Sequence, residues 1–382
     1  MRVCHLITTL DIGGAELMLA RLVEGMDRRR FPTAVMSLAA PGPVADRIRA
    51  AGVDVTTLDM RRGWPAPSGL LRLAGRLRAL RPGVLQTWLY HADLLGLAAG
   101  RLAGVPRILW NVRNSNMRME RYGFLSRRTL DACRLTSRHP DGIVVNSRAG
   151  YEAHRRIGYR PRVWYHIPNG IDTALFRPDA AARARVRLAL GVPPDAPLIG
   201  FAARVDPMKD HDAFLRAAAL LVRRRPAARF LLAGEGTQPG GRLDDPVRRA
   251  GLGGGLLRLG ARADMAALTA ALDVATAASR GEGFPNVVAE ALACGVPCVV
   301  TDVGDGAEIV GGAGVVVPPE NPERLAAAWA DLIDRGPAAR RDLGSAGRAR
   351  IAGSYSLARA VRRYERLYAS VARGDLTLRG AA

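Results

Sequence analysis

The residues with the clearest chemical potential are Glu282 and Glu290, two carboxylates that bracket a Gly-Phe-Pro turn and a helix expected to start near Asn286. Backbone N–H groups at a helix N-terminus attract phosphate. Glu282 can accept hydrogen bonds from sugar hydroxyls, and Glu290 can chelate a ribose diol. An ordinary surface helix is the alternative. The segment predicts a site for a phosphorylated sugar or nucleotide, with the members Glu282, Gly283, Phe284, Pro285, Asn286, Val287 and Glu290.

A second candidate is the pair of cations Arg204 and Lys209, which lie five residues apart across a proline-containing turn. Two such side chains can converge on a diphosphate and neutralise charge on a leaving group. Lys209 is the only lysine among 56 basic residues, which suggests that a compact ammonium is required there. The alternative is that Lys209 is a lysine retained by chance in a solvated loop. The Asp-His-Asp sequence at 210–212 formally matches a metal-binding pattern, but both aspartates lie where helix caps belong, so no metal is predicted.

Two further loops follow expected strands. Gly13 and Gly14 precede a helix, and paired glycines let a backbone approach a ligand closely, although a turn that only reverses the chain is the alternative. The dinucleotide pattern G-x-G-x-x-G is absent, so a dinucleotide site is not favoured. Arg262 lies in a loop that can grip a nucleobase edge, while Asp264 is equally well explained as the N-cap of a helix over 265–272.

The elements that must position these loops alternate between short apolar runs and longer amphipathic stretches. Nearly all-apolar strands in such alternation are typical of parallel sheets covered by helices on both faces. The sequence therefore predicts an α/β protein with two Rossmann-like domains that face each other across a deep cleft. The expected strands are 2–8, 33–38, 53–58, 83–88, 106–112 and 142–146 in the first domain, and 198–204, 228–234, 256–259, 272–277, 297–301 and 314–317 in the second.

The domain boundary is expected at the Pro-Asn-Gly turn of 168–170, with Asn169 and Gly170 as hinge residues that line the cleft. The first domain then covers 1–170 and the second 171–354. A helix over about 355–373 shows an apolar stripe and is expected to return to the first domain. Its stripe consists of Val361, Tyr364, Leu367, Tyr368 and Val371.

Composition excludes several classes of protein. Hydrophobic residues make up 48% and charged residues 24%, as in globular domains. The longest apolar runs fall far short of the roughly 18 residues that cross a bilayer, and no secretion signal is recognised, so we expect a cytoplasmic protein. Four cysteines build no disulfide framework. With only 5% aromatic residues and no recognised motif, nucleic acid is not an expected partner despite the net charge of +21.

At these loops the chain resembles the retaining glycosyltransferases of family 4, which have the two-domain GT-B fold. The resemblance extends from Leu6 to Tyr368 and is closest to the branch that serves O-antigen and other surface-polysaccharide synthesis. Its most specific part is the E-x7-E signature of Glu282 and Glu290, which continues into residues 293–297 and 301–304. The resemblance also depends on Arg204 with Lys209 and on the motifs at residues 13–16, 88–93, 113–115 and 168–172.

The resemblance implies a nucleoside-diphosphate sugar, UDP- or GDP-linked, held by the second domain. It also implies that the first domain holds a saccharide or undecaprenyl-diphosphate-linked acceptor. It implies that the reaction needs no metal ion and no other cofactor. Many relatives carry a histidine at the end of the fifth strand, whereas this chain ends that strand in Arg113. His91, after the fourth strand, can reach the same cleft or can merely bond a neighbouring loop. The catalytic candidates are Arg204, Lys209, Glu282, His91 and Arg113.

The first domain is the more basic of the two, since residues 1–175 contain 27 arginines and 13 acidic residues. Such a lobe suits an anionic lipid surface, and peripheral binding to the inner face of the plasma membrane is one hypothesis; a merely solvated arginine-rich surface is the other. Two other functions stay open, a GT-B sugar-nucleotide epimerase and a non-catalytic two-lobed protein that binds nucleotide sugars. The arginines concerned are Arg28–Arg30, Arg61, Arg62, Arg113, Arg118, Arg121, Arg127, Arg128, Arg134 and Arg138.

Overall fold

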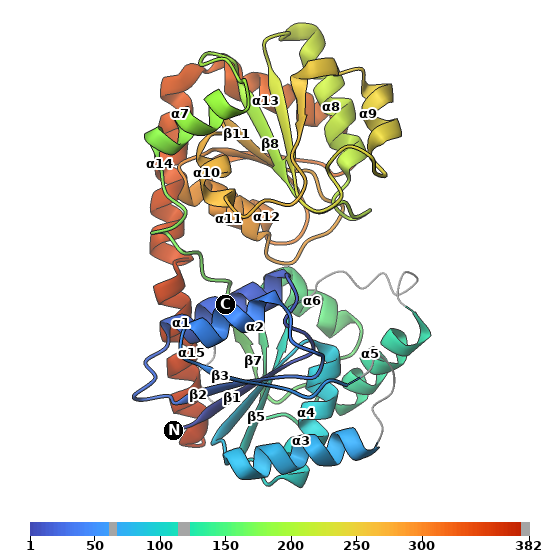
Figure 1. Ribbon diagram of the computed structural model, residues 1–382, viewed down its shortest axis with the longest axis vertical. Coiled ribbons are helices and arrows are strands. Elements are labelled where there is room, and N and C mark those ends of the chain that lie inside the picture. The colour runs from blue at the N-terminus through green and yellow to red at the C-terminus, as the bar shows by residue number, and fades with distance from the viewer. Residues whose placement is uncertain (61–66, 114–122, 376–382) are drawn as a thin grey trace. The chain divides into compact units, whose positions relative to one another are not determined.

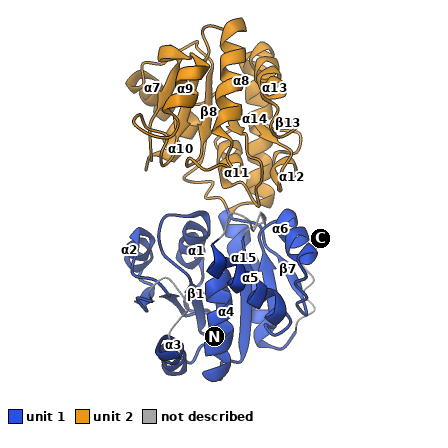
Figure 2. Ribbon diagram, turned by 90° about the vertical axis from the view of Figure 1, so that its right-hand side faces the viewer, with its two compact units in different colours: residues 1–170, 357–382 blue, residues 171–356 orange. Residues whose placement is uncertain are grey.

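The computed structural model describes residues 1–60, 67–113 and 123–375, and these form two compact units. Unit 1 comprises residues 1–170 and the C-terminal segment from Leu357, and unit 2 comprises Ile171–Ser356 (Figure 2). The chain therefore leaves unit 1 at Gly170 and returns to it after Ser356. Arg61, Arg62, Asn114, Ser115, Arg118 and Arg121, which the sequence singles out, lie outside the described residues.

Unit 1 contains a parallel seven-stranded sheet in the order β3-β2-β1-β4-β5-β6-β7 (Figure 1). In its centre Val3 pairs with Thr33 on one side and with Val84 on the other. Strands this apolar need cover on both faces, which their burial confirms. The strands are β1 (Val3–Ile7), β2 (Thr33–Ser37), β3 (Asp54–Thr57), β4 (Val84–Trp88), β5 (Arg107–Val112), β6 (Gly142–Val145) and β7 (Trp164–His166).

Helices cover both faces of this sheet, and a separate hydrophobic core lies between the sheet and the helices on each face. Side chains alternate along β1, so that Val3 and Ile7 enter one core while Cys4 and Leu6 enter the other. The helices α1, α2 and α15 pack on the first face, and α3, α4 and α5 pack on the second. Their bounds are α1 (Gly14–Gly25), α2 (Pro43–Ala50), α3 (Pro67–Leu80), α4 (Tyr90–Leu102), α5 (Phe124–Thr136), α6 (Arg148–Arg156) and α15 (Leu357–Ala372).

The returning helix α15 belongs to the core of unit 1. The five residues of its predicted apolar stripe are all buried, and the ring of Tyr364 stacks on Trp88 with ring centroids 6.1 Å apart. The Tyr364 hydroxyl accepts a hydrogen bond from Asn111 Nδ2 at 2.9 Å. At the start of the helix, Gly170 approaches so closely that an added Cβ would lie 2.7 Å from Leu357 Cα. Only glycine fits at this position.

Unit 2 repeats the architecture with a six-stranded parallel sheet in the order β10-β9-β8-β11-β12-β13. Its strands are β8 (Leu198–Ala202), β9 (Arg229–Ala233), β10 (Leu256–Arg258), β11 (Val274–Ala277), β12 (Cys298–Thr301) and β13 (Gly314–Val317). Its helices are α7 (Ala180–Ala189), α8 (His211–Arg224), α9 (Asp244–Ala250), α10 (Met265–Ala270), α11 (Asn286–Ala293), α12 (Gly306–Val310), α13 (Pro322–Asp334) and α14 (Gly336–Ser354), with a 3-10 turn at Gly253–Gly255.

The twelve predicted strands are confirmed to within one or two residues at most ends, and β7 arises from the apolar run of 163–167. Helix α11 begins at Asn286 as predicted. Asp210 caps α8 as predicted, since its side chain accepts a hydrogen bond from the Ala213 amide. Asp264 occupies the N-cap position of α10 as predicted, but its carboxylate makes no cap bond and pairs with Arg262 instead. None of the described helices is long and apolar enough to cross a membrane.

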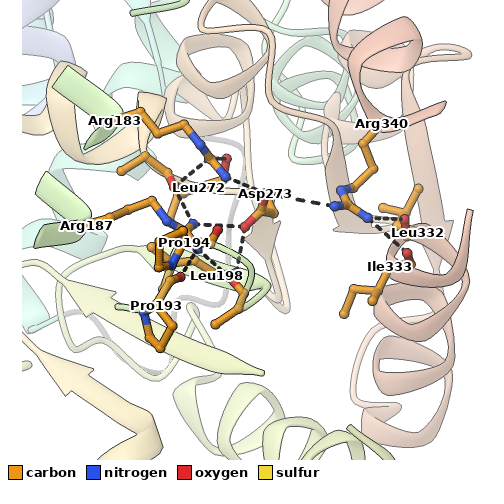
Figure 3. Close-up of polar contacts among 12 residues, drawn as sticks. Arg183, Arg187, Pro193, Pro194, Leu198, Leu272, Asp273, Leu332, Ile333 and Arg340 are labelled. Carbon is orange, nitrogen blue, oxygen red and sulfur yellow. Dashed lines mark hydrogen bonds and ion pairs between the residues drawn. The ribbon is translucent and has the colours of Figure 1, made fainter. Parts of the chain in front are cut away.

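At the amino edge of the second sheet, one carboxylate organises several elements (Figure 3). Asp273, just before β11, accepts hydrogen bonds from Arg183 at 2.8 Å, from Arg187 at 3.1 Å and from the Leu198 amide at 2.8 Å. Arg187 is buried and donates further bonds to the carbonyls of Pro193, Pro194 and Ala196. The network fixes α7 and the loop ahead of β8 to the start of β11.

We expect Asp273→Asn to destabilise the protein by about 3–5 kcal/mol, because it leaves the buried Arg187 guanidinium without its counter-charge. Asp334→Asn is the control, since Asp334 pairs with Arg225 at 2.8 Å but both side chains are nearly half exposed. That change should cost less than about 1 kcal/mol. Urea unfolding of both variants measures the two costs, and equal costs would contradict a special role for Asp273.

Candidate functional site

The predicted donor loops of unit 2 flank the point where the order of its strands reverses. Strands β8 and β11 are neighbours in the sheet, while the chain continues from β8 to β9 on the other side. In open parallel sheets ligands bind in the crevice that this reversal creates at the carboxyl ends of the strands. The loop of 203–210 follows β8 and the loop of 278–285 follows β11, so both border this crevice.

Lys209 and Glu282 meet across the crevice. The Lys209 ammonium donates a hydrogen bond to Glu282 Oε1 at 2.5 Å, and the Ser279 hydroxyl donates to the same oxygen at 2.6 Å. The side chains of Lys209 and Glu282 are 27% and 12% exposed. The two residues predicted to contact a diphosphate and a sugar therefore form one partly buried ion pair.

A second ion pair ties the same two loops. Arg280 donates two hydrogen bonds to Asp210, from Nε at 2.8 Å and from a terminal nitrogen at 3.1 Å, and its amide bonds the Met208 carbonyl. Since Asp210 also caps α8, this contact fixes the start of that helix to the loop after β11. Ser279 and Arg280 were not predicted from the sequence, although their position directly after β11 marks them as candidates.

The loop that carries Glu282 is supported from β12. Thr301 donates a hydrogen bond to the Ser279 carbonyl at 2.6 Å, and the Asp305 amide donates to the Gly283 carbonyl at 2.9 Å. Gly304 has φ +61, and a Cβ there would lie 2.5 Å from the Glu282 carbonyl oxygen. Both the backbone conformation and the close approach require glycine. The position of Glu282 is therefore fixed by its backbone as well as by its ion pair.

The helix of the E-x7-E segment begins without a side-chain cap, since its N-cap residue is Pro285. Phe284 is buried and its ring lies 5.6 Å from that of Tyr355, which anchors the turn. Glu290 is half-buried one turn further on. Its negative charge and burial both raise the pKa of Cys294, to about 12, with burial the larger cause. The Cys294 thiol is therefore protonated at neutral pH.

Arg204 and Arg262 are not part of the Lys209–Glu282 contact. The Arg204 side chain is 64% exposed and lies 3.6 Å from Asp206. Arg262 is exposed and makes a two-bond ion pair with Asp264 at 2.8 Å, which raises the pKa of Arg262 and lowers that of Asp264. Both arginines lie on loops that follow strands of this sheet, after β8 and β10. Their predicted roles in donor binding stay predictions.

In unit 1 the glycine loop after β1 carries a carboxylate of its own. A Cβ added to Gly13 would lie 2.3 Å from Glu16 Oε2, so the buried Glu16 carboxylate folds back over this loop. Gly13 is the N-cap of α1 and Glu16 is the third residue after it, the position from which a glutamate reaches back to a helix start. An anion thus already faces the helix N-terminus that Gly13 and Gly14 open.

Arg113 is tied to the predicted hinge. Its guanidinium donates hydrogen bonds to the side-chain oxygens of Asn111 and Asn169, and lies 4.9 Å from the ring centroid of Trp88. Burial lowers the pKa of Arg113, while Tyr364 and Glu16 oppose that shift. The structure therefore brings Arg113 and Asn169 together, a contact that the sequence did not predict.

His91 lies in the first turn of α4, two residues after a strained residue. Leu89 has φ +72 and ψ 153, a conformation that L-residues rarely adopt. The turn is clamped from both ends by a buried hydrogen bond from the Thr87 hydroxyl to Asp93 Oδ1 at 2.5 Å. Burial lowers the pKa of His91, so its imidazole is neutral at pH 7. His91 is held where the strand order of unit 1 reverses, between β1 and β4.

The Asp-His-Asp sequence shows no sign of a metal site. Asp210 is engaged by Arg280, and His211 is buried with its ring 4.8 Å from that of Phe201. Burial lowers the pKa of His211 to about 4. Within residues 1–60, 67–113 and 123–375, no cluster of three His, Cys, Asp or Glu side chains is arranged to hold a metal ion.

Two family models together match most of the chain. The model described as Glycosyltransferase Family 4 matches residues 12–175, and the model described as Glycosyl transferases group 1 matches residues 196–335. The chain belongs to the family 4, group 1 glycosyltransferases. The first model falls almost entirely on unit 1. The second falls on unit 2 and spans the segments that carry Arg204, Lys209, Glu282 and Glu290.

Two curated relatives of this family 4 chain are matched over different shares of their length. It is 28% identical over 358 residues to the putative glycosyltransferase EpsF of Bacillus subtilis, with 89% of this chain and 88% of the relative covered. It is 36% identical over 239 residues to the D-inositol 3-phosphate glycosyltransferase of Kineococcus radiotolerans, with 56% of this chain and 53% of the relative covered. The match to that relative thus spans about half of its length.

Solved structures confirm the predicted GT-B class of fold for this family 4 chain. The crystal structure of Anabaena Alr3699/HepE in complex with UDP matches this chain with a TM-score of 0.84 at 23% identity. The superposition covers 97% of this chain and 100% of the Anabaena chain. The sucrose-phosphate synthase of Thermosynechococcus elongatus has a TM-score of 0.82 at 20% identity, and covers 98% and 100%. The likeness at this identity establishes the fold.

We expect Asp93→Asn to gain stability over the wild type as the pH rises from about 4 to about 7. Burial raises the pKa of Asp93 well above its usual value, so the folded protein keeps a proton that the unfolded chain has released, and wild-type stability falls with pH in this window. Asparagine removes that loss, which amounts to at most about 1.4 kcal/mol per pH unit.

Urea unfolding of both proteins at several pH values measures this difference for Asp93. Below the unfolded-state pKa, near 3.8, both side chains are uncharged, so the comparison there isolates the effect of the amide itself. A stability difference that stays constant from low to neutral pH would show that Asp93 ionises without penalty in the folded protein.

Proposed function

We propose that this chain is a retaining glycosyltransferase of the hexosyltransferase type. It transfers a sugar from a nucleoside-diphosphate sugar, UDP- or GDP-linked, to a saccharide acceptor carried on a lipid diphosphate such as undecaprenyl diphosphate. The product enters surface-polysaccharide or O-antigen synthesis. The enzyme works in the cytoplasm, at the inner face of the plasma membrane, and uses no metal ion or other cofactor.

The observation that carries the proposal is the Lys209–Glu282 ion pair in the crevice between β8 and β11. An ammonium there can bind the diphosphate of a donor, and the carboxylate beside it can accept hydrogen bonds from sugar hydroxyls. The donor supplies a new anionic partner for Lys209, so that Glu282 is released toward the sugar. Structural neighbours support this donor class, since the Anabaena protein was crystallised in complex with UDP and with UDP-glucose.

In the proposed reaction, the bond from the sugar C1 to the diphosphate oxygen breaks. A bond from an acceptor hydroxyl oxygen to C1 forms on the same face, which retains the configuration. The hydroxyl proton passes to the departing diphosphate. Lys209 and Arg204 neutralise the charge that develops on this leaving group, and Glu282 orients the sugar. Two cationic side chains thus take the role for which other transferases use a metal ion.

On the acceptor side, we assign neutral His91 and charged Arg113 to the acceptor saccharide. Both follow strands of unit 1 at the carboxyl edge of its sheet, where ligands of parallel sheets bind. The lowered pKa of His91 leaves one ring nitrogen free to accept a hydrogen bond from an acceptor hydroxyl. Glu290 binds the donor ribose, and Gly13 and Gly14 approach the diphosphate through their backbone.

Thermal unfolding with ligands tests the donor site. In EDTA, UDP or GDP should stabilise the wild type, by about 2.7 kcal/mol when the free ligand is at 100 times its dissociation constant. Glu290→Ala should lose most of this gain, because it removes the partner of the ribose. Glu323→Ala, an exposed glutamate of α13 in the same unit, is the matched control and should keep it. If no nucleoside diphosphate stabilises the wild type, the proposed donor site is wrong.

The single lysine provides an independent test. Because Lys209 carries the only ε-amine of the chain, an amine-reactive acyl reagent reports on this one side chain, apart from the N-terminus. We expect UDP to slow its acylation several-fold, since a diphosphate covers the ammonium. The labelled peptide is quantified by mass spectrometry, with the N-terminal peptide as internal control. An unchanged rate at saturating UDP would place the diphosphate elsewhere.

A further inference from the structure

The two helix layers of unit 1 differ in the balance of their charges. Helices α1, α2 and α15 contain seven arginines and four acidic residues, and helices α3, α4 and α5 contain seven arginines and two acidic residues. One of those two, Asp93, is 0% exposed, so Asp131 is the one acidic side chain that these three helices expose. The helices of the second layer therefore expose more net positive charge than those of the first.

Two arginines of each layer differ in the kind of group that they bond: those of the first layer meet carboxylates, and those of the second meet neutral carbonyls. In the first layer Arg47 pairs with Glu24 at 2.6 Å and Arg49 pairs with Asp46 at 3.0 Å. In the second, Arg78 donates to the Leu102 carbonyl at 2.8 Å and Arg101 donates to the His139 carbonyl at 2.8 Å. Neutral carbonyls orient a guanidinium without cancelling its charge. The second pair of bonds also joins α3 to the end of α4, and the end of α4 to the segment after α5.

Exposed apolar side chains accompany these arginines. Leu71 on α3 is 65% exposed, Leu102 on α4 is 53%, and Phe124 and Leu135 on α5 are 71% and 64%. None of the large hydrophobic side chains that the described residues expose lies on α1, α2 or α15. Single exposed leucines are ordinary, but four on one acid-poor helix layer mark an interaction surface.

Helix α5 shows the pattern most clearly. Thr129, Leu130 and Cys133 point into the core, while the outward side presents Phe124, Arg127, Arg128, Asp131 and Leu135. These outward residues recur at intervals of three and four, as one face of a helix requires. The Arg128 guanidinium lies 5.0 Å from the ring centroid of Phe124. Arginine beside exposed Phe and Leu on one face is the composition of a helix that lies in a membrane interface.

We propose that α3, α4 and α5 form a docking surface for an anionic lipid bilayer, called here the α3–α5 surface. Phe124 and Leu135 enter the interface, and the arginines contact lipid headgroups. The exposed apolar side chains favour a lipid over a hydrophilic polyanion, because they gain nothing from a polyanion. This inference deepens the proposed location at the membrane and is independent of the sugar transfer itself.

Flotation with vesicles tests the charge of the α3–α5 surface. The full chain should float with vesicles of phosphatidylcholine and phosphatidylglycerol, and far less with phosphatidylcholine alone. Arg127→Gln with Arg128→Gln should weaken this binding roughly tenfold or more. Arg223→Gln with Arg224→Gln, an exposed pair on α8 of unit 2, removes the same charge and should leave binding nearly unchanged. Equal loss in both double variants would overturn the assignment to this surface.

A second pair of variants separates lipid from other anions. Phe124→Ser with Leu135→Ser should also weaken flotation several-fold, whereas Leu175→Ser with Leu188→Ser, both exposed on unit 2, should not. If only the arginine variants lose binding, the surface is a general polyanion site and the lipid proposal fails. A wild type that floats with neither vesicle overturns it outright. Stabilisation by UDP, measured on the same proteins, reports on the donor site separately.

Discussion

The structure of the candidate donor site depends on one topological constraint, the reversal of strand order between β8 and β11. Because right-handed crossovers send the chain to opposite sides of the sheet at this point, the two following loops are left with no helix between them. Lys209 and Asp210 come from one loop, and Glu282 and Arg280 from the other. Two ion pairs, each between the loops, therefore bridge the crevice and also define its width.

The two ion pairs differ in what they allow. Arg280 binds Asp210 with two bonds, and Asp210 is fixed in turn as the cap of α8, so that pair is part of the framework. Lys209 makes its contact with a flexible side chain and one oxygen of Glu282. Breaking a partly buried pair is costly unless another charge replaces the lost one. In the proposed reaction a diphosphate provides that replacement, so we infer that the Lys209 pair is the exchangeable one.

Much of this architecture could be predicted from the sequence because it depends on local pattern. The strands are short and nearly all apolar, and Arg204, Lys209 and Glu282 lie in the loops that follow them, so both sheets and the site loops could be placed. The pairing of side chains could not, because it depends on distances between loops far apart in the chain. Even within one loop, the Asp264 carboxylate at the N-cap position of α10 pairs with Arg262 instead of bonding the helix amides. Arg113 bonds Asn169, 56 residues away.

The two units use different interactions to hold the loops at the point where their strand order reverses. In unit 2, ion pairs bridge the crevice. In unit 1, the corresponding turn after β4 is held by the strained Leu89 and by the buried hydrogen bond from Thr87 to Asp93, a carboxyl group whose burial raises its pKa well above the usual value. A buried hydrogen bond from a hydroxyl has no counter-ion to lose, so it keeps its geometry whether or not a charged ligand arrives. Rigidity of this kind suits a neutral hydroxyl that must be aimed, and exchangeable charge suits a diphosphate that must be bound and released.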